Sequence, residues 1–131
     1  MILFINTSDF KKLQLALISL QTAKEFTATL AFNENYRTNE LLQKFLSKNK
    51  LAPQDITKVF VCSGPGSFTG IRVGVSLAQA LGFALQIPVV LIPQNKIPPD
   101  LLKLTTFKIS EKNLVHYGQK PNIGKIKKTV Q

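Results

Sequence analysis

Cysteine, histidine and tryptophan are almost missing from this chain, which has one Cys, one His and no Trp among its 131 residues. Cys62 has no second cysteine with which to form an internal disulfide, and such a free thiol suits a reducing compartment. Because His116 is the single histidine and no His, Asp, Glu and Cys residues recur at ligand spacing, the sequence argues against a metalloprotease. We therefore expect a cytoplasmic protein without a metal of its own.

Acidic residues are scarce as well. Seven Asp and Glu stand against 17 Lys and Arg, which gives a formal net charge of +10 at pH 7. Residues 95–131 carry eight of the basic residues and two of the acidic ones, so the excess is concentrated near the C-terminus. This charge favours an anionic partner without specifying a fold. The final lysines either contact phosphates of a nucleic acid or remain solvated: Lys120, Lys125, Lys127 and Lys128.

The N-terminus lacks a long apolar run. In "MILFINTSDFKK" the apolar stretch is short and the basic residues follow it, so it predicts neither a signal peptide nor a membrane span. The whole chain is 44% hydrophobic, which is enough for one globular domain with a core that needs no disulfide or metal.

Three short strands are predicted in the first third of the chain. Residues 2–5 form a continuous apolar run, residues 14–20 alternate imperfectly, and residues 24–32 alternate with Phe26, Ala28 and Leu30 on one face. Short links between such strands predict an antiparallel meander.

Helices and strands then alternate. Leucines and a phenylalanine at helical spacing predict an amphipathic helix over residues 38–48, capped by Thr38 or Asn39. A strand over 58–63, a helix over 68–85 and a strand over 89–92 follow, and this helical crossover makes the last two strands parallel. The predicted order is βββαβαβ, an α/β fold with a mixed sheet. Residues 1–93 would form this lobe, and residues 94–131 a short helix after Pro99 and a basic, partly mobile extension.

The stretch "VCSGPGSFTGIRVGVSLAQALG", residues 61–82, joins a strand to a helix, where ligands often bind in α/β sheets. Free amides there can hold an anion. However, Gly70 is followed by Ile71 and Arg72 instead of the Lys and Ser/Thr of a phosphate loop, and Thr69 replaces the third glycine of a dinucleotide fingerprint. The alternative is a sharp turn with Ser67 or Thr69 as the helix cap.

Small residues recur every fourth position in the helix that follows: Gly70, Gly74, Ala78 and Gly82. This spacing places them along one face. Each interior glycine costs about 1 kcal/mol of helix propensity relative to alanine, so the row indicates close approach of another backbone. That backbone belongs either to the chain's own sheet or to a partner helix.

The stretch from Gly64 to Ile92, together with "ILFINTS", resembles the TsaB (YeaZ) family, the non-catalytic paralogue in threonylcarbamoyladenosine synthesis on bacterial tRNA. The resemblance implies one lobe of a ribonuclease-H-like, actin-like ATPase fold. It also implies a scaffold that binds the catalytic paralogue TsaD through helices. The ATPase TsaE joins this complex, and the scaffold can pair with itself through the same helices. ATP and metal are then expected on the partners, with no cofactor on this chain, and tRNA is reached indirectly or through the basic tail.

The family signature falls on one loop and helix start: Gly64, Pro65, Gly66, Ser67, Phe68, Thr69, Gly70 and Arg72. The resemblance places partner binding on the helices over 38–48 and 68–85, and we assign it to Leu41, Leu42, Phe45, Gly74, Ala78 and Gly82.

Two departures from the family pattern bear on catalysis. Asn6 stands where the first strand of the family ends in aspartate, which removes a carboxylate from the site of an actin-like ATPase. The chain is also too short for the second lobe of typical members. We therefore expect a protein that is not an enzyme. The alternatives are a degenerate ATPase or phosphotransferase that uses the 64–70 loop, and a basic RNA-binding module.

Overall fold

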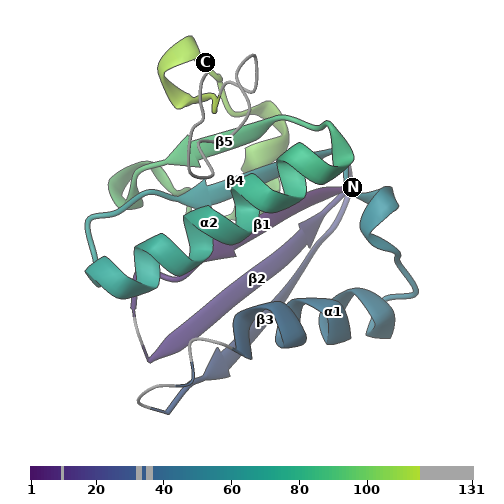
Figure 1. Ribbon diagram of the computed structural model, residues 1–131. Helices are drawn as coiled ribbons and strands as arrows, with labels where there is room; N and C mark the ends of the chain where they lie inside the picture. Colours follow the sequence, from purple (N-terminus) through teal and green to yellow (C-terminus); the bar gives the residue numbers. More distant parts are fainter. Residues whose placement is uncertain (10, 32–33, 35–36, 116–131) are drawn as a thin grey trace.

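The computed structural model describes residues 1–9, 11–31, 34 and 37–115 (Figure 1). Its main elements occur in the predicted order βββαβαβ. They are β1 (Ile2–Asn6), β2 (Lys12–Ile18), β3 (Ala23–Thr29), α1 (Thr38–Lys48), β4 (Lys58–Cys62), α2 (Phe68–Leu85) and β5 (Val89–Ile92).

The five strands form one sheet in the order β3-β2-β1-β4-β5. β1 pairs antiparallel with β2, and β2 pairs antiparallel with β3, which confirms the predicted meander. β4 is parallel to β5, as the helical crossover through α2 requires, and it is also parallel to β1. The sheet therefore changes direction at β1, its central strand.

The register divides the apolar side chains between two faces of the sheet. Leu3 lies opposite Leu17 on β2 and Val59 on β4, and all three belong to a core cluster that α1 and α2 complete. The neighbouring Phe4 lies opposite Ala16 and Phe60, and these belong to a second cluster. Figure 1 shows both long helices on the first of these faces.

The second face is covered by the chain that follows β5. A 3-10 helix, η4 (Leu101–Thr106), begins at Asp100, whose carboxylate accepts a hydrogen bond from the amide of Leu102 at 3.1 Å. Leu101 and Leu104 are buried in the second core cluster. The short helix expected after Pro99 is therefore present, and this part of the extension belongs to the core.

The chain beyond η4 also closes the outer edge of β5. The amide of Val115 donates to the carbonyl of Val89 at 3.0 Å, and the Asn113 side chain donates to the carbonyl of Leu91 at 3.1 Å. The predicted mobile segment, His116 and the four terminal lysines lie outside the described residues.

One predicted cap is wrong. Helix α1 has Arg37 at its N-cap position, and no side-chain hydrogen bond caps the helix there. Thr38 is already helical and is buried, while Asn39 lies within the first turn. Packing of Thr38 in the interior thus overrides the capping preference of threonine.

Candidate functional site

The loop between β4 and α2 is tied to the elements on either side of it. The amide of Ser67 donates to the carbonyl of Ser8 at 2.7 Å, and the carbonyl of Gly64 accepts from the amide of Gln94 at 2.9 Å. The Ser67 hydroxyl accepts from the amide of Gly70 at 3.1 Å, which confirms Ser67 as the predicted cap of α2. These three hydrogen bonds thus connect the loop to the β1–β2 turn, to the start of α2 and to the chain after β5.

The small residues of α2 face the chain's own sheet. We call Gly70, Gly74, Ala78 and Gly82 the inner row of α2; all four are buried. A Cβ atom at Gly70 would overlap the carbonyl oxygen of Thr7, and one at Gly74 would overlap the Thr7 hydroxyl. That hydroxyl is buried and donates to the carbonyl of Gly70 at 2.6 Å. The close backbone approach indicated by the sequence therefore occurs between α2 and the end of β1.

This placement bears on the partner-binding residues assigned from the sequence, which stay a prediction. Five of those six residues are buried in the chain's own interior: Leu42, Phe45, Gly74, Ala78 and Gly82. Leu41 is half-buried and packs against the same core. In the folded chain, Leu41 is therefore the one of the six that is partly accessible to a partner.

The opposite side of α2 is exposed. We call Phe68, Arg72, Ser76, Ala80 and Ala84 the outer row of α2; they recur every fourth position, about half a turn from the inner row. Phe68 is 74% exposed, and near the other end of the helix Phe83 is 37% exposed. The spacing of this row was visible in the sequence, but periodicity alone does not tell which side of an apolar helix is buried.

By length and composition alone, helix α2 would suffice to cross a membrane. Four of its 18 residues, those of the inner row, are buried in the fold, and Val75, Leu77 and Leu81 are half-buried against the core. Its inner row nevertheless packs on the sheet, as in a helix at the surface of a globular domain. An exposed apolar face of this kind typically marks a protein interaction site.

A polar pocket of about 310 Å³ lies at the carboxyl end of β1, where an actin-like ATPase site is expected. Its lining is mostly amide and hydroxyl: Asn6, Ser8, Asp9, Lys12, Gln14, Thr27 and Gln94. The Gln94 side-chain oxygen accepts from the Ser8 hydroxyl at 3.0 Å and from the Cys62 thiol at 3.2 Å. Cys62 is fully buried.

This pocket is poor in metal ligands. Its one carboxylate, that of Asp9, accepts from the backbone amide of Lys11 at 2.9 Å. Within the described part of the chain, no three His, Cys, Asp or Glu residues are close enough together to hold a metal ion. None of residues 64–72 lines the pocket. The signature loop contacts this region through the hydrogen bond from the Ser67 amide to the Ser8 carbonyl.

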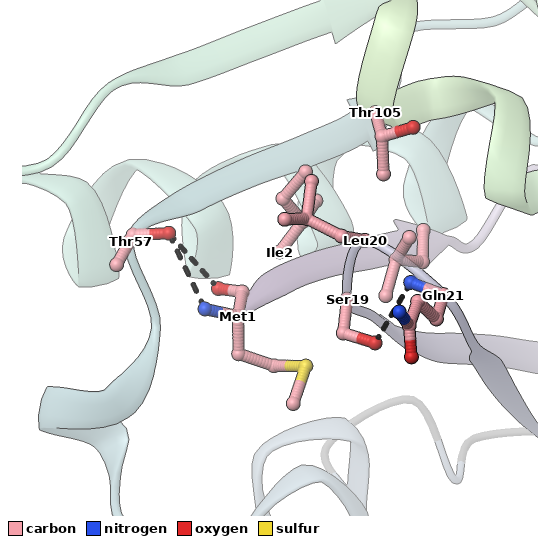
Figure 2. A pocket seen from close by; sticks show the side chains of 8 residues that line it. Met1, Ile2, Ser19, Leu20, Gln21, Thr57 and Thr105 are labelled. Carbon is pink, nitrogen blue, oxygen red and sulfur yellow. Dashed lines mark hydrogen bonds between the residues drawn. The ribbon is translucent and has the colours of Figure 1, made fainter.

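A second pocket, of about 530 Å³, lies at the opposite end of the strands, where β1 begins (Figure 2). Met1 and Ile2 line it together with Leu20, and Thr57 accepts and donates hydrogen bonds at the Met1 backbone. It contains no residue of the signature and no charged side chain, so we do not assign it a role.

Comparisons with known proteins agree with this geometry. The family model for "TsaD: tRNA N6-adenosine threonylcarbamoyltransferase" matches residues 31–96. The tRNA threonylcarbamoyladenosine biosynthesis protein TsaB of Bacillus subtilis is 39% identical over 89 residues, which are 67% of this chain and 38% of that protein. This chain belongs to the TsaB (YeaZ) family.

Solved structures of other proteins support the fold. YeaZ from Pseudomonas aeruginosa superimposes with a TM-score of 0.64 at 26% identity, over 70% of this chain and 43% of YeaZ. RuvC of T. thermophilus, solved with a Holliday junction substrate, has a TM-score of 0.50 at 12% identity, over 72% of this chain and 64% of RuvC. The TsaB-family chain thus has the predicted ribonuclease-H-like, actin-like lobe, and it spans about two fifths of the relatives TsaB and YeaZ.

Proposed function

We propose that this chain is a non-catalytic scaffold in the biosynthesis of threonylcarbamoyladenosine on tRNA. It acts by binding a TsaD-like catalytic paralogue, and a TsaE-like ATPase joins the complex. The names of the TsaB relatives support the pathway. The observation that carries the binding role is the outer row of α2, an exposed face on a helix whose buried side is already occupied by the sheet.

The polar pocket at the carboxyl end of β1 supports a role without catalysis. Asn6 presents an amide at the end of β1, where it donates toward the side-chain oxygens of Gln14 and Gln94 at 3.4 and 3.5 Å. Magnesium bound to a nucleotide prefers carboxylate ligands, and an amide supplies no negative charge. We therefore place ATP and metal on the partner proteins, and tRNA contact on the assembled complex in the cytoplasm.

The binding role can be tested with the full chain and the TsaD-like paralogue from the same organism, by surface plasmon resonance. Ala80→Arg places a long charged side chain in the middle of the outer row and should weaken the affinity at least about tenfold, because a desolvated charge there has no partner. Thr106→Arg adds the same side chain on η4, across the sheet, and should leave the affinity unchanged.

Unfolding curves of both variants should match that of the wild type, since both sites are exposed. Absence of any binding by the wild-type chain would contradict the scaffold proposal, and so would equal affinities for Ala80→Arg and Thr106→Arg. Reconstituted threonylcarbamoylation of tRNA should require the chain and should fall with Ala80→Arg at limiting protein concentration.

A further inference from the structure

Arg72 is the one charged residue of α2, and it lies on the outer row between Phe68 and Ser76. Its guanidinium carbon is 5.2 Å from the centre of the Phe68 ring, an arrangement in which the cation is held over the aromatic face. Both side chains are exposed. The pair therefore presents a pre-oriented guanidinium at the N-terminal end of the outer row.

Arg72 has no acidic partner in the part of the chain that the structure describes. The ion pairs found there join Arg37 to Glu34, and Glu40 to both Arg37 and Lys44. An arginine covered by an interface without a carboxylate would lose its hydration without compensation. A partner that covers the outer row must therefore supply an acceptor for Arg72, and a carboxylate matches the planar guanidinium best.

A second copy of this chain does not supply that acceptor from its facing helices. α2 contains no acidic residue, and the acidic residue of α1, Glu40, is already paired with two basic side chains. Pairing α2 with α2 would also bring two Arg72 side chains into one interface. Charge complementarity thus favours a different chain over self-association.

We propose that Arg72, held on Phe68, is the specificity anchor of the outer row, and that it selects an apolar surface with an exposed carboxylate on the catalytic paralogue over a second copy of this chain. This inference rests on the proposed scaffold function and adds the chemistry of the partner's surface. RNA phosphate is also an acceptor for arginine, but the exposed Phe68 ring beside Arg72 and the alanines farther along the outer row fit a protein better than a polyanion.

The test compares Arg72→Glu and Arg72→Lys with Lys103→Glu, which reverses an exposed charge on η4 across the sheet. Affinity of the full chain for the TsaD-like paralogue is measured at low and high salt. Arg72→Glu should weaken it at least about tenfold, Arg72→Lys severalfold because the bidentate geometry is lost, and Lys103→Glu not at all. Reversing one exposed acidic residue of the paralogue to lysine should restore binding of Arg72→Glu.

Three outcomes would overturn the inference. If the wild type binds the paralogue and Arg72→Glu binds equally well, the anchor is wrong while the scaffold function stands. If Arg72→Glu lowers the affinity for tRNA alone but not for the paralogue, the acceptor is phosphate. If the wild type does not bind the paralogue and instead self-associates in sedimentation experiments, both the anchor and the scaffold function fail.

Discussion

The two sides of α2 differ in their packing: the inner row is buried against the chain's own sheet, and the outer row is exposed. On the inner row, Gly70 and Gly74 leave no space for a Cβ atom because Thr7 fills it. On the outer row, Phe68 and Arg72 contact each other and are otherwise exposed. Gly70, Gly74 and Ala78 of the inner row are thus explained by packing inside the fold, whereas the outer row is exposed. The comparison teaches that small residues in a helix can mark internal packing, while the proposed binding surface lies on the other side.

Gly74→Val should have the largest effect on folding. The new side chain would overlap Thr7, so we expect a loss of about 3 kcal/mol or more in the free energy of unfolding, at the upper end of overpacking costs. Ala80→Val places the same side chain on the outer row and should cost less than about 0.7 kcal/mol, the difference in helix propensity. Urea unfolding followed by circular dichroism measures both, and similar losses would break the distinction between the rows.

Thr7→Val tests the contact that the inner row makes with β1. The substitution keeps the shape of the side chain and removes the hydroxyl that donates to the buried carbonyl of Gly70. We expect a loss of about 1–3 kcal/mol, because that carbonyl loses its side-chain donor. Thr7→Ser retains the donor and serves as the control; if Thr7→Val were as stable as the wild type, the hydroxyl would not hold α2 in place.

Ser67→Ala tests the N-cap of α2, next to the first residues of both rows. Loss of the cap hydrogen bond to Gly70 should cost about 1 kcal/mol. Ser67→Asp supplies another capping acceptor and should restore most of the stability. Affinity of the folded protein for its partner should change little in both variants, and a large loss of affinity at unchanged stability would place Ser67 in the interface.

Local patterns were sufficient to predict most of the fold. The bounds of α1, α2 and β5 follow from apolar spacing and from the prolines and glycines that flank them, and the βββαβαβ order then specifies which strands are parallel. The segment after β5 was harder. The short helix after Pro99 was predicted, but Leu101 and Leu104 are only two apolar positions in a six-residue 3-10 helix, so the sequence did not show that they cover the second face of the sheet.

The candidate site could be predicted only in part. The sequence located the signature loop and helix α2, and it predicted a cap at Ser67 or Thr69, of which Ser67 is the one observed. It did not tell which side of α2 is buried, because glycine and alanine suit both a sheet and a partner helix. That choice depends on Thr7, which is 63 residues before Gly70 and contacts it only in the folded chain.

One pair of substitutions tests the central claim most directly. Ala78→Leu and Ala80→Leu introduce the same side chain two positions apart, one in each row of α2. For each variant, the melting temperature and the affinity of the folded chain for the TsaD-like paralogue are measured together. We predict that Ala78→Leu loses about 1–3 kcal/mol of stability with unchanged affinity, and that Ala80→Leu keeps its melting temperature and changes the affinity. The reverse pattern, a stable Ala78→Leu with altered affinity and an Ala80→Leu that binds as the wild type does, would contradict the account.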